Sequence, residues 1–358
     1  MLTTTQSSEH NDSHMVSSSA CNQTSQCPYI FPGTERGDPL SEIGAFGQRY
    51  DSIDGVLEHA VNDTEHYIVG FVMIFMAMLG IVANGILIHG VLRTSVFGRF
   101  YGRLLLHRSI AEVVSCLITA IFFTPYVMMS SSVSDSLNIA FTTVFVFSLS
   151  TTYLIHFVVA VNRFCAVYFP IHYNQSSQAQ WKQAAVHLLL AVLAGIITSL
   201  SFFFKCSQFV FSRQRYDILA LGCNYSDQEF SEAKRMITIV VIIWGSCAFA
   251  ALSVDLLTLV RVILYTTIMK SSGSFSNRQN LRFFLQSFSL NIVICSGVVT
   301  THVLSDHFDS PFARFWFSLF HVILGFILNG LIPVLFNSEL RNMCRRRNAT
   351  VVAVASQI

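Results

Sequence analysis

Seven long apolar stretches, separated by short polar segments, fill the chain between residues 67 and 336. Each is long enough to cross a bilayer as a helix, which takes about 20 residues for a hydrocarbon core about 30 Å thick. We therefore predict an all-α fold, a bundle of seven transmembrane helices. The predicted spans are Tyr67–Leu92, Leu104–Met129, Leu137–Val161, Gln183–Phe204, Met236–Leu264, Phe283–Leu304 and Phe312–Phe336.

The composition narrows the class of protein further. Of the 358 residues, 53% are hydrophobic and only 12% are charged, and 32 are phenylalanine. A soluble domain has about 25% charged residues, about twice the fraction found here. We therefore expect a membrane protein, whose main partner is the lipid bilayer. The nine cysteines show no metal-type pairing, and no metal, cofactor or nucleic-acid partner is expected.

Charged residues around the first span predict how the bundle is oriented. Three acidic residues precede this span and three arginines follow it. Positive charge favours the cytoplasmic side, so the amino-terminal end is expected outside and the carboxyl-terminal end inside. The chain would then consist of a disordered extracellular tail (1–66), a seven-span domain (67–336) and a cytoplasmic tail (337–358). The acids are Glu58, Asp63 and Glu65, and the arginines are Arg93, Arg99 and Arg103.

The predicted outer side carries candidates for covalent modification. Cys206 and Cys223 bound most of the long loop between the fourth and fifth spans. In an oxidising compartment they are expected to form a disulfide within this loop, and a free, buried Cys206 is the alternative. Four acceptor triplets for N-glycosylation also fall on this side. The acceptors are Asn11, Asn22, Asn62 and Asn224.

A charged motif closes the third span. Asn162-Arg163-Phe164 is followed by Cys-Ala-Val-Tyr-Phe-Pro. A lone arginine is expected where a helix meets water, because a charge at the bilayer centre is costly. One interpretation is a boundary arginine that extends to the lipid headgroups. The other rests on resemblance, since this segment resembles the Asp-Arg-Tyr region of rhodopsin-like G-protein-coupled receptors.

The resemblance to these receptors extends from residue 67 to about residue 345. Gly80-Ile-Val-Ala-Asn84 is similar to the first-helix motif, and Ser109-Ile-Ala-Glu112 stands where the second helix has its acidic motif. Asn329-Gly-Leu-Ile-Pro333 stands where the seventh helix has Asn-Pro-x-x-Tyr. Phe336–Arg341 then stands where the family has a short amphipathic eighth helix.

A more specific resemblance is to the nematode serpentine chemoreceptors of the Srx class. It rests on Thr94–Gly98, Asn162–Ala166, Asp255–Arg261, Arg282–Gln286 and Asn329–Asn337. It implies a chemosensory receptor that binds a small molecule and activates a heterotrimeric G protein. The expected location is the plasma membrane, with the cilium of a sensory neuron as one setting, and no enzymatic activity is expected.

The resemblance assigns a coupling switch to Asn162, Arg163, Asp255 and Asn329. Asn162 stands where the family has an acid, so Arg163 lacks its usual adjacent carboxylate. We predict that Asp255 takes this role and holds Arg163 in the resting state. The alternative is a local pair of Asp255 with Arg261, since these residues lie on similar sides of one helix.

Two further departures from the family concern the sixth span and the long outer loop. The sixth span has no Trp-x-Pro motif. No cysteine lies near Asn138, so the usual disulfide from the third helix to the long outer loop cannot form.

Glu112 is an acid within the second span, and such residues are functional candidates by default. With rhodopsin-like packing, Asn84, Thr152 and Asn329 would surround it. The functional hypothesis is an ion or proton pocket that biases the conformational equilibrium. The alternative is a protonated glutamic acid that is hydrogen-bonded in the core.

Aromatic residues in the outer halves of the spans suggest a site for a small ligand, because such pockets are mostly apolar. No acid lies in the outer part of the third span, which disfavours a cationic amine. Packing in the core or against lipid is the alternative for each ring. The candidates are Phe122, Tyr126, Phe141, Phe145, Trp244, Phe315 and Trp316.

Cys344 precedes three arginines and is a candidate for lipidation next to a basic membrane contact, or else an unmodified thiol. A channel or transporter with seven spans is the main rival function. The apparent lack of an inverted repeat and the few internal charges argue against it.

Overall fold

The computed structural model describes residues 63–94, 97, 99–129, 134–169, 173, 180–203, 208–221, 227–268 and 274–342. Within these residues, seven helical segments are long and apolar enough to cross a membrane. The prediction of an all-α, seven-helix fold is confirmed. The observed segments are Thr64–Arg93, Phe100–Met128, Asp135–Tyr168, Trp181–Leu200, Ala233–Leu264, Phe284–Leu304 and Pro311–Phe336.

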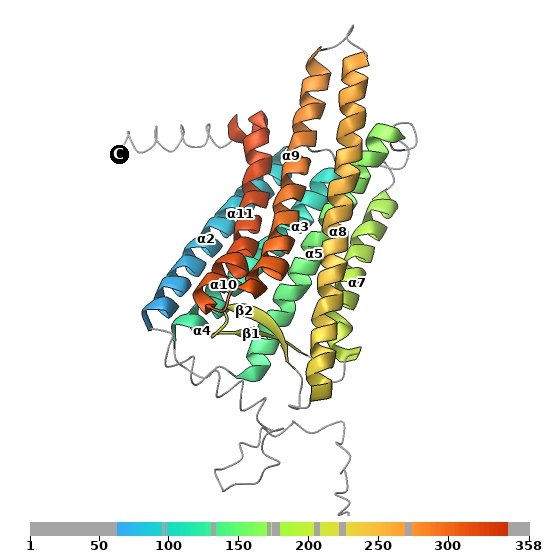
Figure 1. Ribbon diagram of the computed structural model, residues 1–358. Coiled ribbons are helices and arrows are strands. Elements are labelled where there is room, and N and C mark those ends of the chain that lie inside the picture. Colours follow the sequence, from blue (N-terminus) through green and yellow to red (C-terminus); the bar gives the residue numbers. More distant parts are fainter. Residues whose placement is uncertain are drawn as a thin grey trace, which may run out of the picture. The chain divides into compact units, whose positions relative to one another are not determined.

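Several of these spans contain more than one helical element (Figure 1). The second and sixth spans each include a short π-helical stretch, η1 and η2. The described elements are α2 (Asp63–Arg93), α3 (Arg99–Ile118), η1 (Thr119–Phe123), α4 (Thr124–Met128), α5 (Asp135–Tyr168), α7 (Gln180–Phe203), β1 (Gln208–Ser212), β2 (Asp217–Leu221), α8 (Asp227–Ile268), α9 (Ser274–Val299), η2 (Thr300–Leu304), the 3₁₀-helix η3 (Ser305–His307), α10 (Pro311–Phe317) and α11 (Leu319–Phe336).

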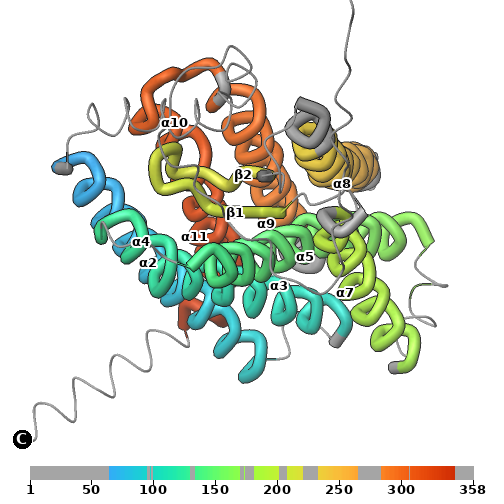
Figure 2. The backbone as a smooth tube through the Cα atoms, turned by 90° about the horizontal axis from the view of Figure 1, so that it is seen from below, coloured from blue at the N-terminus to red at the C-terminus, as the bar shows by residue number. Residues whose placement is uncertain are grey.

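The helix α5 lies at the centre of the bundle (Figure 2). It packs against α3, α7 and α8, and near its start against β1. In its apolar window 72% of the residues are buried, compared with 28% in the span that α7 forms. The helix α2 packs against both α3 and α11, and α9 packs against both α8 and α11. A polar side chain on the inner faces of α5 is therefore surrounded by protein rather than by lipid.

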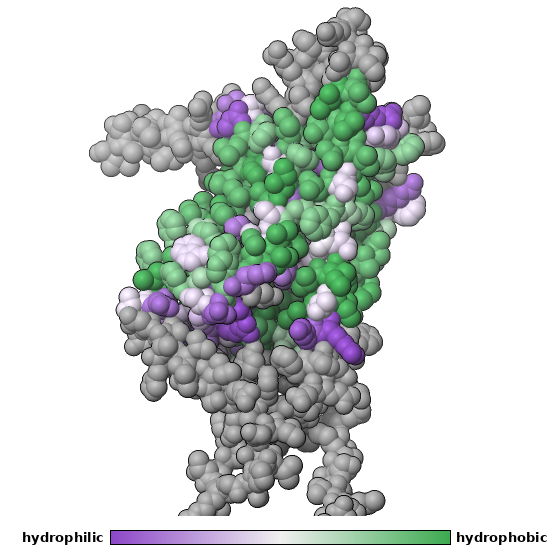
Figure 3. Space-filling model, in the orientation of Figure 1, coloured by the Kyte–Doolittle hydropathy of each residue, from purple (hydrophilic) through white to green (hydrophobic). Residues whose placement is uncertain are grey.

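The outward faces of the helices are apolar. Hydrophobic residues cover most of the described part of the visible face in Figure 3. Large apolar side chains such as Phe71, Ile121 and Leu188 are well exposed on the surface of the bundle. Lipid tails are the favourable surroundings for such a surface, and helices satisfy their backbone hydrogen bonds within it. These features are those of a multi-pass membrane protein.

The third span is longer than the sequence predicts. The helix α5 continues past Val161 to Tyr168, so Arg163 lies inside the helix, more than one turn before its end. The physical reason is Pro170, because a proline disfavours the helical conformation of the residue before it. Phe169 accordingly has left the helix, with φ −130° and ψ 55°.

The helix α8 is unusually long. Its 42 residues span about 63 Å at a rise of about 1.5 Å per residue. A bilayer with its headgroups is about 40–45 Å thick, so α8 is longer than the membrane. The fifth span therefore continues as a helix beyond the lipid.

The segment between the fourth and fifth spans contains a β-hairpin, where the sequence predicts only a polar loop. Strands β1 and β2 are antiparallel, with Gln208 opposite Leu221 and Ser212 opposite Asp217. Side chains alternate along β1: Phe209 and Phe211 are buried against the bundle, whereas Gln208 is exposed and Val210 and Ser212 are half-buried. We call the end of the bundle that carries this hairpin the hairpin end, and the opposite end the Arg163 end.

Gly330 sets how closely α2 and α11 approach each other. A Cβ atom added to Gly330 would lie 2.8 Å from the backbone carbon of Ala83 and 2.8 Å from the backbone nitrogen of Asn84. Backbone atoms cannot rotate away, so Gly330→Ala is expected to force the helices apart and to cost about 1–3 kcal/mol of stability. The thermal denaturation midpoint of the purified protein measures this loss.

Gly325→Ala is the matched control for this change. It lies on the same helix, and the nearest atom to an added Cβ is Val293 Cγ1 at 4.0 Å. Equal midpoints for the two variants would contradict the expected close contact.

Candidate functional site

Arg163 is anchored at its end of the bundle by an aromatic residue of α3. Its Nη2 donates to the hydroxyl of Tyr101 at 2.6 Å, and the guanidinium lies 4.8 Å from the centroid of the Tyr101 ring. The same hydroxyl accepts a longer hydrogen bond, 3.4 Å, from Nε2 of Gln286. Tyr101 thus connects α3 with α5 and with α9.

A second set of hydrogen bonds joins α5, α9 and α8. Asn291 Nδ2 donates to Asp255 Oδ2 at 2.8 Å, and Asn291 Oδ1 lies 3.1 Å from His156 Nδ1. Because the amide oxygen can only accept, Nδ1 of His156 must carry the proton. All three side chains are buried. A single amide on α9 therefore ties the centre of the bundle to the fifth span.

Asp255, the predicted partner of Arg163, lies within electrostatic reach of that guanidinium. Its own hydrogen bonds involve α9, through Asn291. Arg261, the alternative partner, places its guanidinium 4.0 Å from the centroid of the Tyr168 ring on α5. Which arginine Asp255 restrains stays a prediction.

Glu112 is fully buried and has a charged neighbour on its own helix. Arg108 Nε lies 3.5 Å from Glu112 Oε1, and Asn329 Nδ2 donates to the same oxygen at 2.7 Å. Arg108 also reaches α11, where its Nη2 donates to the backbone oxygen of Asn329 at 2.9 Å. These contacts join α3 to α11, and the Arg108 guanidinium serves as the counter-ion of the Glu112 carboxyl.

The other residues predicted around Glu112 are also buried, and the Asn84 side chain interacts with the Glu112 carboxyl. Asn84 Nδ2 donates to the backbone oxygens of Phe326 (3.0 Å) and Gly80 (3.1 Å), which holds α2 against α11. Thr152 Oγ1 donates at 3.1 Å to Ser148, one turn earlier on α5. An ion or proton role for this pocket stays a prediction. Asn162 is half-buried near the Arg163 end.

The predicted ligand-pocket aromatics form separate groups of contacting rings near the hairpin end. Phe122 stacks on Phe141, with centroids 4.5 Å apart, and lies beside Tyr126. Phe315 contacts Trp316 at 5.4 Å. These contacts show packing between rings, and binding of a ligand among them stays a prediction.

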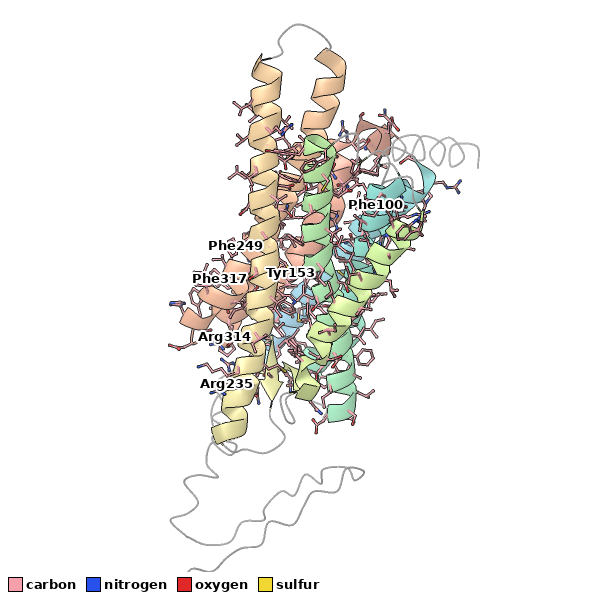
Figure 4. The ribbon with its side chains drawn as sticks, turned by 90° about the vertical axis from the view of Figure 1, so that its right-hand side faces the viewer. Phe100, Tyr153, Arg235, Phe249, Arg314 and Phe317 are labelled. Carbon is pink, nitrogen blue, oxygen red and sulfur yellow. The ribbon has the colours of Figure 1, made fainter. Side chains whose placement is uncertain are left out.

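Phe123, which belongs to the same outer aromatic residues, and Tyr153, which the sequence did not single out, add further ring contacts. Phe123 stacks on Phe211 of β1 at 4.3 Å and lies 5.3 Å from Phe145. Tyr153 stacks on Trp244 at 5.4 Å, inside the bundle (Figure 4), and Trp244 Nε1 donates to Ser150 Oγ. The hairpin therefore contributes to the same aromatic layer as the helices.

Several predicted sites lie outside the described residues. They are the disulfide pair Cys206 and Cys223, the lipidation candidate Cys344, and the glycosylation acceptors Asn11, Asn22, Asn62 and Asn224. Within the residues that are described, no group of three or more His, Cys, Asp or Glu side chains is arranged to hold a metal ion.

The start of the predicted eighth helix is described. Residues 338–342 are helical. Asn337 caps this turn, since its Oδ1 accepts from the backbone nitrogen of Glu339 at 3.0 Å. Leu340 is buried against Leu87 and Leu105. Amphipathic character beyond this turn stays a prediction.

Comparison with known families identifies the chain. The family described as "Serpentine type 7TM GPCR chemoreceptor Srx" matches residues 74–337, which is most of the sequence. The chain belongs to the Srx family. The resemblance to Srx and rhodopsin-like receptors found in the sequence is thereby confirmed.

A curated protein and a solved structure are also similar to this chain. "Serpentine receptor class X 45" of Caenorhabditis elegans is 21% identical over 301 residues, covering 78% of this chain and 81% of that protein. The crystal structure of squid rhodopsin matches with a TM-score of 0.59 and 10% identity, covering 82% of this chain and 87% of rhodopsin. At that identity, the likeness to rhodopsin shows the fold alone.

The sequence did not reveal three members of the buried network of this Srx receptor, namely Arg108, His156 and Asn291. Arg108 had a usable signal, because residues four apart on a helix are neighbours and Arg108 precedes Glu112 by four. His156 and Asn291 stand 135 residues apart in the sequence. No local pattern links such residues.

Proposed function

We propose that this Srx-family protein is a G-protein-coupled chemoreceptor of the plasma membrane, with the cilium of a sensory neuron as its setting. Its amino-terminal end and the hairpin end of the bundle face outside. A small uncharged molecule binds among the aromatic residues of the hairpin end. A heterotrimeric G protein binds at the Arg163 end.

The observation that carries this proposal is a pair of polar clusters between the helices, a half-buried one around Tyr101 at the Arg163 end and a buried one around Asn291. Their hydrogen bonds run between α3, α5, α8 and α9, through Tyr101, Asn291 and their partners. An outward movement of α8 or α9 must break at least one of these bonds. Such a network favours two discrete arrangements, and a ligand that binds one of them more tightly shifts the population.

The residues of the predicted switch have definite tasks in this proposal. Asp255 restrains Arg163 in the resting state, and separation of the helices frees Arg163 for the G protein. Glu112, with Arg108 as its counter-ion and Asn329 as its partner, biases the same equilibrium from the middle of the bundle. Asn84 keeps α2 and α11 together during the change.

The ligand is proposed to be uncharged because of what surrounds the aromatic layer. The acid of the first turn of α5, Asp135, is exposed rather than turned into the bundle. The hydroxyl that contacts Trp244 is neutral, since Ser150 Oγ accepts from Trp244 Nε1. The charged neighbours of Tyr126, Asp135 and Arg213, are not fully buried, so they would give a charged ligand little compensation within the bundle.

The disulfide predicted between Cys206 and Cys223 is part of this proposal. Gln208 pairs with Leu221, and each further pair steps inward by one residue on each strand. In the sequence, Cys206 precedes β1 by two residues and Cys223 follows β2 by two residues. This equal spacing from the two paired strand ends favours a disulfide between them.

A chemical screen tests the proposed function. The receptor is expressed with a promiscuous G protein, and calcium release is recorded for a panel of small uncharged volatiles. An active compound is expected to lose at least ten-fold in response with Arg163→Ala at matched surface expression. Arg93→Ala, an exposed arginine at the end of α2, is the control.

The rival function predicts a different outcome of the same screen. A channel would give a ligand-evoked current that persists when no G protein is present. Such a current, with an unchanged response in Arg163→Ala, would replace the receptor proposal.

A further inference from the structure

One side chain of α5 connects the bundle to the β-hairpin. Asn138 Nδ2 donates to the backbone oxygen of Phe211 at 3.0 Å, and the backbone nitrogen of Phe211 donates to Asn138 Oδ1 at 3.0 Å. A side-chain amide presents a carbonyl and an N–H group side by side, as a peptide group does. Asn138 thus pairs with β1 as a residue of a neighbouring strand would.

The Asn138 side chain is itself held in place. Thr142, one turn further along α5, donates from Oγ1 to Asn138 Oδ1 at 3.1 Å. Asn138 is buried, so water has little access to compete for its amide. The amide is therefore fixed in the orientation that Phe211 requires.

The contact decides where a ring of the hairpin lies. Phe211 stacks on Phe123, with centroids 4.3 Å apart and planes 16° apart, and its ring lies 6.2 Å from Tyr126. Phe123 in turn contacts Phe145. Tyr126 and Phe145 belong to the predicted ligand pocket, so the hairpin forms one side of that aromatic layer.

The hairpin has a second anchor at its turn. Tyr216 adopts a positive φ of 51° and is fully buried. Its hydroxyl lies 2.9 Å from His66 Nδ1 on α2. Beside it, Arg213 Nε donates to the backbone oxygen of Val127 at 3.1 Å. These contacts hold the turn, whereas Asn138 holds the strand.

We propose that Asn138 is the positioning residue of the hairpin. Its amide holds Phe211 on Phe123 and so closes the hairpin end of the bundle over the aromatic layer. No cysteine lies near Asn138, so no disulfide can join this part of α5 to the hairpin. The link therefore consists of hydrogen bonds, which break and re-form reversibly, whereas a disulfide would have to be reduced before the hairpin could separate from α5.

The meaning of this closure rests on the proposed function, in which the aromatic layer holds the ligand. Entry and release of the ligand would then require the Asn138 contact to open. The positioning itself needs neither ligand nor G protein, so it is tested without either.

Hydrogen–deuterium exchange of the full-length receptor in detergent micelles tests the proposal. In Asn138→Ala, the backbone amides of β1 are expected to exchange at least ten-fold faster than in the parent protein, because Phe211 loses its acceptor and the strand its anchor. Peptides from α2 and α11 are expected to exchange at the parent rate.

Two further variants keep the test decisive. Thr151→Val removes a buried hydroxyl from the same helix that donates only to α5 itself, at Phe147, and is expected to leave β1 unchanged. Asn138→Asp keeps an acceptor for the Phe211 nitrogen but loses the donor, and is expected to give an intermediate rate. If the Asn138→Ala protein does not fold, the Asn138→Asp protein serves as the test in its place.

Parent-like exchange of β1 in the Asn138 variants would overturn the proposal. Faster exchange that includes α2 and α11, or that also occurs in Thr151→Val, would do the same, because it would indicate general loosening. No agonist is present in this experiment, so a failed ligand screen leaves its result intact, and the reverse holds as well.

Discussion

Replacing Arg108 by methionine is expected to destabilise the receptor by about 3–5 kcal/mol. Arg108 and Glu112 are both almost fully buried, and breaking a buried ion pair from one side leaves a charge without compensation. The backbone oxygen of Asn329 also loses its donor. The expected result is a sharp loss of monodisperse protein on size-exclusion chromatography and a lower thermal denaturation midpoint.

The double variant Arg108→Met, Glu112→Gln separates this explanation from a simple loss of packing. Replacing both members of a buried pair is often neutral, so most of the lost stability should return. Arg93→Met, at an exposed arginine, is expected to match the parent protein. A single Arg108→Met variant as stable as the parent would show that the pair is not important for the fold.

Replacing Asn291 by leucine is expected to raise signalling in the absence of ligand. The change keeps the size of the side chain but removes the bond to Asp255 and the bond to His156. A hydrogen bond to a charged group contributes about 1.5–3 kcal/mol, so losing this contact in the resting state alone shifts the equilibrium by about ten-fold or more. Basal second-messenger output at matched surface expression measures the shift.

Ser296→Ala provides the control for Asn291, since this serine lies on the same helix and donates only within it, to Val293. Charge reversal at Asp255 is expected to raise basal output as well, because it removes the predicted restraint on Arg163. Basal output that is unchanged in both variants would mean that the network does not hold the resting state.

The spans were predictable because lipid imposes a simple rule on sequence. A helix in a bilayer must be apolar over about 20 residues, and each of the seven segments satisfies that rule. Helix ends were less predictable, since the hydrophobic pattern stops before the helix does. The seven residues of α5 beyond Val161 remain helical, and the helix ends before Pro170 because a proline disfavours the helical conformation of the residue before it.

The site was predictable only where a charge stood alone in an apolar stretch. Glu112 and Arg163 are recognisable as charges within apolar spans, whereas the role of Arg108 depends on its position one helical turn before Glu112. Asn291 is an ordinary polar residue until the fold places His156 and Asp255 on either side of it. Contacts between distant parts of the chain carry no local signal.

The hairpin was missed because its pattern is short. Only Phe209 and Phe211 alternate with polar or half-buried neighbours on β1, in a segment with many polar residues. The partners that stabilise it, Phe123 and Asn138, come from other spans. Tertiary contacts here decide the local structure.

The length of α8 means that a small change of its tilt moves its far end by a larger distance. Ile268 lies about 20 Å along the helix axis from Asp255, at about 1.5 Å per residue. A tilt of about 10° at the level of Asp255 would swing that tip sideways by about 3 Å, the width of a side chain. A small rearrangement among the packed helices would thus become a larger displacement of the part of α8 that extends beyond the membrane.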